Sequence, residues 1–271
     1  MTDNFSAESD SPNEIAQGCG IVQNEAYKTS EEYDLDIPRE VAEKIQKTTY
    51  KLISEDKVKD LQYVDISDNT YCIVKRIMDV CLSAVGLIIL MIPIMVIAVI
   101  ILADDHGKVL FSHFRIGLNG KKFVIYKFRT MKIGAPEYLP TMNMIDPNQY
   151  ITRAGHKLRK LSLDEIPQLL NVLKGDMSLV GPRPLIAEEY DIHQMRSKFG
   201  VCNLKPGITG LAQINGRDTV SPMDKVRWDV EYLKNFGLVM DLKILFATIP
   251  KIFRAIDVVE GYCMKEHDVG Q

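Results

Sequence analysis

The chain has 271 residues and a formal net charge of −3, and its apolar and charged fractions are ordinary for a globular protein. The charge is unevenly divided: residues 1–70 carry 7 Lys and Arg against 16 Asp and Glu, or −9, and residues 71–271 carry 26 against 20, or +6. A surplus of this size is too small to indicate nucleic acid binding, so we expect no nucleic acid partner. It does suit phosphates or anionic lipid head groups.

Residues 1–70 are expected to form an acidic N-terminal extension, partly disordered because its first stretch is rich in Ser, Asp and Asn. A helix of modest amphipathicity is predicted from Pro38 to about Lys59. The first apolar run lies too far along the chain to be a signal peptide. The cysteines are scattered without metal-ligand or redox spacing, and we expect reduced thiols in a cytoplasmic setting. They are Cys19, Cys72, Cys81, Cys202 and Cys263.

Residues 80–103 carry no charge and are almost entirely apolar. As one helix they would be about 36 Å long, against about 30 Å for the hydrocarbon core of a bilayer. No face of that helix is polar, which favours a membrane segment over the buried core helix of a soluble protein. Either a single span or a re-entrant hairpin fits this length.

Two observations favour the hairpin. Pro93 lies near the middle of the segment and can break the helix, although spanning helices also tolerate proline. Basic residues mark the cytoplasmic side of a membrane, and here they lie on both sides of the segment. Lys75 and Arg76 precede it, and Lys108, Arg115, Lys121 and Lys122 follow it. We therefore expect a re-entrant hairpin broken at Pro93, with both termini in the cytoplasm.

After the membrane segment, the pattern predicts a small β-hairpin and several helices, so the expected fold class is α+β and mainly helical. Asn119-Gly120, a pair typical of tight turns, separates the predicted strands 109–117 and 122–129. Helices are predicted at 156–159, 163–173, 185–199, 224–236 and 239–256, and loops at 131–150, 181–184 and 205–210. The amphipathic helices suit either the bilayer interface or ordinary core packing.

Residues 158–184 contain the best candidates for chemistry, Asp164 and Glu165, at the start of a predicted helix. One interpretation is structural: Ser162 and Glu165 fit a capping box, and Asp164 alone fits an N-cap. The other is catalytic, because a helix N-terminus favours anions and both carboxylates could face one phosphate or ion. Cations from other segments would complete a phosphoryl-transfer site. The candidates are Arg115, Lys127, Arg129, Arg159 and Arg183.

Four strings occur in an order that resembles the bacterial sugar transferases, the monotopic polyprenyl-phosphate phosphoglycosyl transferases. The resemblance covers about residues 71–256. The strings are KRIMD at 75–79, RIGLNGKKFVIYKFRTM at 115–131, LRKLSLDEIPQLLNVLKGDMSLVGPRP at 158–184 and KPGITGLAQINGR at 205–217. Two departures stand out: Ile92-Pro93 replaces the Ser-Pro of many relatives, and His113 stands where Gln is common.

The resemblance implies an enzyme of the bacterial inner membrane with a re-entrant helix. It would transfer a sugar 1-phosphate from a UDP-sugar to polyprenyl (undecaprenyl) phosphate and release UMP. This step initiates the assembly of exopolysaccharide, capsule, O-antigen or related glycans. The implied cofactor is Mg²⁺. Other polysaccharide-assembly proteins are possible partners, and the acidic extension is one place where they could bind.

The resemblance also implies roles for individual residues. Asp164 corresponds to the nucleophile that becomes a covalent phosphosugar intermediate, and Glu165 to the residue that helps bind Mg²⁺ or moves a proton. Both are therefore expected metal ligands. Arg159 is expected to contact phosphate and Arg183 the nucleotide sugar. Similar phosphate-binding roles for Arg115, Lys127 and Arg129 follow from their charge and position alone.

The expected organisation is the extension 1–70, a membrane-associated transferase domain 71–256 with its membrane segment at 80–103, and a tail 257–271. Two alternatives remain. A non-catalytic assembly or regulatory protein could keep the fold, although the intact Asp164–Glu165 dyad, with Arg159 and Arg183 on either side, argues against it. A single-span receptor would place one terminus outside the cell, and labelling of Cys19 or Cys263 from outside would reveal it.

Overall fold

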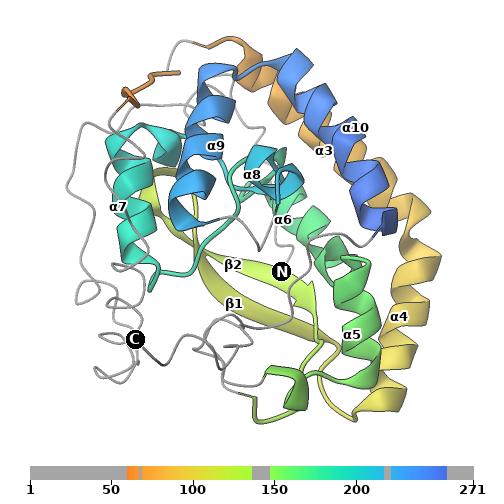
Figure 1. Cartoon of the computed structure of the whole chain (residues 1–271). Helices are drawn as coiled ribbons and strands as arrows, with labels where there is room; N and C mark the ends of the chain where they lie inside the picture. Colours follow the sequence, from red (N-terminus) through yellow and green to blue (C-terminus); the bar gives the residue numbers. More distant parts are fainter. Residues whose placement is uncertain (1–59, 67–68, 136–146, 217–220, 255–271) are drawn as a thin grey trace, which may run out of the picture.

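The computed structural model describes residues 60–66, 69–135, 147–216 and 221–254. Helices dominate these ranges and two small sheets complete them, which confirms the expected α+β, mainly helical class (Figure 1). The predicted helix 38–59, most of the acidic extension, much of the loop 131–150 and the tail 257–271 lie outside the described residues.

The elements follow one another in the order of Figure 1. They are α3 (Tyr71–Ile89), α4 (Met91–Asp104), β1 (Leu110–Ile116), η3 (Leu118–Gly120), β2 (Lys122–Phe128), η5 (Pro147–Gln149), α5 (Arg153–Lys160), η6 (Leu163–Gln168), α6 (Leu169–Lys174), β3 (Ser178–Val180), α7 (Tyr190–Lys198), η7 (Val201–Asn203), β4 (Gly207–Thr209), α8 (Leu211–Ile214), α9 (Pro222–Lys234) and α10 (Leu238–Arg254).

The apolar segment is bent by 61° between α3 and α4, and the bend lies at Leu90. The predicted break at Pro93 is therefore wrong by three residues. Proline has no N–H to donate to the carbonyl four residues earlier, which is that of Ile89, and its ring crowds that carbonyl. The distortion consequently falls at Leu90, directly after Ile89, while Pro93 itself lies in the first turn of α4. A bend of 61° is also far from the full reversal of an antiparallel hairpin.

Helix α3 has its polar side chains inside and its apolar side chains outside. Its buried residues are Lys75, Asp79 and Ser83, and α4 buries only Ile97 and Ile101. The outward side chains are large and apolar: Ile73, Val74, Ile77, Leu82, Val85, Ile88, Ile89, Met91, Ile92, Met95, Val96, Val99, Ile100 and Leu102. By length and composition, no single helix in the described ranges could cross a bilayer, whereas α3 and α4 together meet that test as a bent pair.

The predicted β-hairpin is confirmed. Strands β1 and β2 pair antiparallel, with Leu110 opposite Phe128 and Ile116 opposite Lys122. Between them, Asn119 and Gly120 both have positive φ values, 53° and 74°. Asn and Gly tolerate this left-handed conformation best, which is why the pair predicts the turn so well.

A second sheet was not predicted. Strand β4, inside the expected loop 205–210, runs parallel to β3. The backbones approach so closely that a Cβ on Gly207 would lie 2.1 Å from the amide nitrogen of Gly181. Both positions therefore require glycine, and the GPRP string at 181–184 lies directly beside the KPGITG string.

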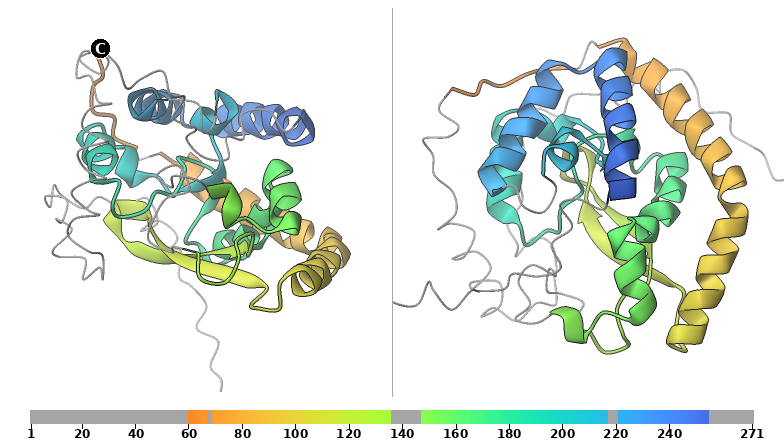
Figure 2. Two further views of the ribbon diagram at one scale, coloured as in Figure 1. Left: turned by 60° about the horizontal axis from the view of Figure 1, so that its bottom comes forward. Right: turned by 45° about the vertical axis from the view of Figure 1, so that its right-hand side comes forward.

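The main core lies between α7, α9, α10 and β3, with Val180, Val226, Tyr232 and Ile244 among its fully buried residues. Helix α7 begins at Tyr190, five residues later than predicted, and α9 and α10 begin within two residues of their predictions. Helices α7 and α9 pack into this core. Helix α10 meets α3 near the N-terminal ends of both and then diverges from it (Figure 2). The apolar side chains on its open face are Leu238, Val239, Leu242, Phe246, Ile249 and Ile252.

Cysteine pairing differs from the expectation. Cys72 is disulfide-bonded, so the expectation of a reduced thiol is wrong at this position. Cys81 and Cys202 are free thiols, as expected.

Candidate active site

The Asp164–Glu165 pair lies in η6, a short 3₁₀ helix between α5 and α6. Ser162 precedes it in the left-handed conformation, with φ 55°, and makes no side-chain cap hydrogen bond. Asp164 lies inside the first turn rather than at the cap position. The capping interpretation is therefore wrong for Ser162, which makes no side-chain cap hydrogen bond, and for Asp164, which is not at the cap position. Left-handed backbone is uncommon for a residue other than glycine and often occurs at functional sites.

Glu165 is the point where three separate segments meet. Its Oε1 accepts hydrogen bonds from Lys127 Nζ at 3.0 Å and from Arg183 Nη1 at 3.4 Å. Lys127 comes from β2, against which η6 packs, and Arg183 comes from the GPRP segment after β3. The Glu165 side chain is 9% exposed, Lys127 20% and Arg183 31%. The two cations are thus more open to solvent than the carboxylate they share, and both could reach an incoming anion.

Asp164 is as buried as its neighbour, since both residues are 7% exposed. A 3₁₀ helix has three residues per turn, so adjacent side chains point about 120° apart. The structure therefore places Asp164 next to Glu165 but turned away from it around the helix axis.

Arg159 lies one turn before the dyad, at the end of α5. Its carbonyl accepts the N–H of Ser162 at 3.0 Å, and its Nε donates to Thr130 Oγ1 at 2.9 Å. Helix α5 also packs against η6. Arg159 is therefore near the dyad and is held by Thr130, the second residue after β2.

Arg129 lies elsewhere. Its guanidinium contacts the carboxylate and the carbonyl of Asp105, each at 2.6 Å. The neighbouring Asp104 accepts the N–H of Ala154 at 2.8 Å, at the start of α5. The end of α4 is thus tied to the hairpin and to α5, beside which it runs in Figure 2. The structure brings Arg129 together with Asp105, not with Glu165.

Arg115 is the penultimate residue of β1, and the next residue, Ile116, donates its backbone N–H to the carbonyl of Leu185, just after the GPRP segment. Its Nη1 donates to Nδ1 of His113 at 2.6 Å and to the carbonyl of Phe114 at 3.0 Å. Burial lowers the pKa of Arg115 to about 10; nearby Glu189 opposes this shift and the positive charge of Arg183 adds to it. Arg115 is thus within electrostatic range of Arg183 and still protonated at neutral pH.

Sequence reasoning missed Asn171, which docks α6 onto β2. This side chain is fully buried; its Oδ1 accepts the N–H of Tyr126 at 3.0 Å and its Nδ2 donates to the carbonyl of Val124 at 2.6 Å. The contact fixes η6 and α6 against the strand that carries Lys127. Its signal in the sequence was a single amide inside the apolar run 169–173.

A small pocket has a volume of about 20 Å³, and its lining includes Pro182, Arg183, His193 and Arg196. It has room for about one water molecule and not for a nucleotide sugar. His193 Nε2 contacts the carbonyl of Ile186 at 2.8 Å, and burial lowers the pKa of His193 to about 4. This region supports the GPRP segment from inside the core.

The bacterial sugar transferase family matches residues 70–255. The exopolysaccharide production protein ExoY of Rhizobium meliloti is 39% identical over 192 residues, which cover 66% of this chain and 84% of that protein.

Two further relatives are longer proteins. The undecaprenyl-phosphate galactose phosphotransferase of Salmonella typhimurium is 39% identical over 194 residues, covering 66% of this chain and 40% of that protein. The UDP-glucose:undecaprenyl-phosphate glucose-1-phosphate transferase of Escherichia coli is 38% identical over 189 residues, covering 67% of this chain and 40% of that protein. The matched family region contains Lys127, Glu165 and Arg183. The chain therefore belongs to the bacterial sugar transferase family and is a transferase enzyme.

Proposed function

We propose that the enzyme transfers a sugar 1-phosphate from a UDP-sugar to polyprenyl (undecaprenyl) phosphate at the bacterial inner membrane and releases UMP. The observation that carries this proposal is the shared contact of Lys127 and Arg183 with Glu165, because it gathers two cations at a buried carboxylate next to Asp164. Relatives named for undecaprenyl phosphate and for galactose or glucose phosphate support the same substrate classes. The step would initiate exopolysaccharide, capsule or related glycan assembly.

The proposed reaction has two displacements at one phosphorus atom. A carboxylate oxygen of Asp164 attacks the β-phosphorus of the UDP-sugar, and the bond to the α-phosphate oxygen breaks, so that UMP leaves with the electron pair. An oxygen of polyprenyl phosphate then attacks the same phosphorus and displaces Asp164. The product is a polyprenyl diphosphate sugar, and the carboxylate is regenerated.

The basic side chains would bind and orient the phosphates. Arg183 and Lys127 are anchored by Glu165 yet partly open, so they suit the diphosphate of the donor. Arg159, in the helix that precedes the dyad, suits the phosphate of the acceptor. Arg115 would add positive charge next to Arg183.

Magnesium is proposed as the cofactor. In the described residues there is no group of three or more His, Cys, Asp or Glu side chains that could hold a metal. Asp164 and Glu165 nevertheless fit Mg²⁺, since this ion is commonly bound by one or two carboxylates together with substrate phosphates. When bound, it would neutralise charge on the diphosphate.

The apolar outer surface of α3 and α4 supports a membrane location, because large exposed apolar surfaces mark membrane or protein contacts. The bent pair would enter one leaflet and leave both termini in the cytoplasm. The open apolar face of α10 would lie at the interface. The acidic extension 1–70 would bind another polysaccharide-assembly protein; unchanged glycan output and localisation after its deletion would contradict this.

The test uses purified full-length protein in detergent with Mg²⁺, undecaprenyl phosphate and a panel of UDP-sugars. We expect UMP release with at least one donor, and its loss in Asp164→Asn. A mass increase of the protein by one sugar phosphate, absent in Asp164→Asn, would support the covalent step. No release by folded protein with any donor would contradict the proposed reaction and favour a non-catalytic family member.

A further inference from the structure

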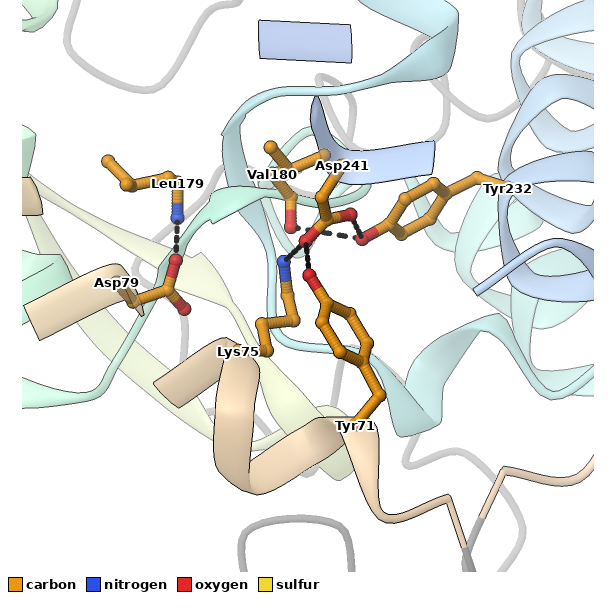
Figure 3. Close-up of polar contacts among 7 residues, drawn as sticks. All are labelled: Tyr71, Lys75, Asp79, Leu179, Val180, Tyr232 and Asp241. Carbon is orange, nitrogen blue, oxygen red and sulfur yellow. Dashed lines mark hydrogen bonds and ion pairs between the residues drawn. The ribbon is translucent and has the colours of Figure 1, made fainter. Parts of the chain in front are cut away.

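Helix α3 is joined to the rest of the protein by polar contacts, several of which Figure 3 shows. The Tyr71 hydroxyl donates to Asp241 Oδ2 at 2.7 Å, and Lys75 Nζ reaches the same oxygen. Tyr232 donates to the other oxygen of Asp241 at 2.7 Å. Asp241 is fully buried, so this cluster fixes the first turns of α3 against α9 and α10.

One turn further along α3, Asp79 holds β3. Its Oδ1 accepts the backbone N–H of Leu179 at 2.9 Å, and the residue is only 2% exposed (Figure 3). Leu179 lies two residues before the GPRP string, which carries Arg183. Asp79 therefore binds the backbone just ahead of the segment that reaches Glu165.

Arg76, also on α3, holds the end of helix α6, which precedes β3 in the chain. Its Nη1 donates to the carbonyl of Val172 at 2.6 Å and its Nη2 to that of Leu173 at 2.9 Å. These carbonyls lie in the last turn of α6, the helix that continues directly from η6 and its dyad. The cation also suits the negative end of the helix dipole.

The chain from Glu165 to Arg183 thus forms a loop whose ends meet at the contact between Glu165 and Arg183. Its middle is held by Arg76 at one point and by Asp79 at another. The elements within it are short: α6 has six residues and β3 has three. Elements of this length hold little position by themselves, so external contacts decide where their ends lie.

We propose that Arg76 and Asp79 are positioning residues, which set the separation of Glu165 and Arg183 and link the site to the seating of α3 in the bilayer. The outer face of α3 is apolar and would contact lipid, while its inner face makes directional hydrogen bonds to backbone atoms of the site loop. A shift of α3 would therefore move the loop at two points, the end of α6 and the backbone of Leu179. The expected changes in kcat and KM rest on the proposed function. The expected change in hydrogen exchange of the site loop does not.

The kinetic test compares full-length Asp79→Ala, Asp79→Asn and Tyr71→Phe in nanodiscs of anionic lipid. Asp79→Ala removes the acceptor for Leu179, and we expect kcat to fall about 10- to 100-fold and the KM for the UDP-sugar to rise, since small misplacements of binding groups cost rate heavily. Asp79→Asn keeps an oxygen acceptor and should stay within about threefold of wild type by the same reasoning. Tyr71→Phe loses a contact at the N-terminal end of α3, two turns before Asp79, and should lower Tm without changing KM.

Hydrogen exchange of residues 180–186 supplies a readout that does not depend on activity. We expect faster exchange there in Asp79→Ala, with Asp79→Asn and Tyr71→Phe close to wild type. Unchanged exchange in Asp79→Ala would overturn the positioning role, even if the wild type released no UMP. Absence of UMP release from the wild type would instead contradict the proposed function alone. If the KM for the UDP-sugar changed equally in Asp79→Ala and Tyr71→Phe, general destabilisation of the protein would explain the change, and the proposal would be overturned.

Discussion

Lys127 Nζ lies 3.0 Å from Glu165 Oε1, although 38 residues separate them in the chain. The contact exists because η6 packs across β2, where Asn171 ties the following helix to the backbone of the same strand. It joins the β-hairpin to the dyad and defines one side of the proposed phosphate site. Its partner on the other side, Arg183, comes from a third segment.

Replacing Lys127 with Met should reduce UMP release about 100-fold, because the change removes one phosphate-binding cation and leaves a mostly buried carboxylate with one partner fewer. Steady-state kinetics in detergent would measure it. The matched control is Lys174→Met, which alters an exposed lysine that contacts Tyr126 on the same strand. Equal losses in the two variants would contradict a specific role for Lys127.

Arg183→Lys should raise the KM for the UDP-sugar about tenfold or more, because an ammonium group cannot contact Glu165 and a phosphate with the geometry of a guanidinium group. The measurement is the dependence of UMP release on donor concentration. Arg227→Lys, at a more exposed ion pair with Asp60, should leave KM unchanged. An unaltered KM in Arg183→Lys would remove this residue from the donor site.

Arg129→Gln should lower stability and leave the KM values close to wild type, since Arg129 binds Asp105 at the end of α4. Hydrogen bonds to charged groups suggest a loss of about 2 kcal/mol. Thermal unfolding in detergent would measure it, and the double variant with Asp105→Asn should lose less than the sum of the two single changes. A raised KM with unchanged Tm would instead return Arg129 to the substrate site.

Asn171→Leu should destabilise the protein by about 2–4 kcal/mol, because two part-buried backbone groups of β2 lose their hydrogen bonds to a fully buried side chain. Both Tm and UMP release should fall, since the same contact holds η6 over Lys127. Leu170→Asn, at the exposed neighbouring position, is the control and should have little effect. A stable and fully active Asn171→Leu protein would show that α6 is held on β2 by other contacts.

Stability should fall on acidification between about pH 6.5 and pH 4 through His193. Burial lowers its folded-state pKa to about 4, so in this range the unfolded chain binds more protons than the folded protein. The stabilising contribution is complete above pH 6.5 and lost as the pH approaches 4, with a size of about 3 kcal/mol. The unfolding free energy of wild type and His193→Gln should therefore converge in acid. Parallel pH curves would contradict this assignment.

The sequence by itself determined the features that depend on neighbours along the chain. Asn119-Gly120 predicted the tight turn, and Gly175 ends α6 with φ 93°. In each case one or two residues have a backbone preference that needs no distant partner. The family strings likewise identified the bacterial sugar transferase family, whose match covers residues 70–255.

Only the tertiary structure decided which side chains meet. Lys127 and Arg129 are two residues apart, and strand periodicity would place both on one face. Strand β2 ends at Phe128, however, so Lys127 reaches Glu165 while Arg129 turns to Asp105. The partners of Asp79, Asn171 and Arg183 were equally hidden. A long-range contact depends on how whole elements pack, and local sequence preferences carry no information about that packing.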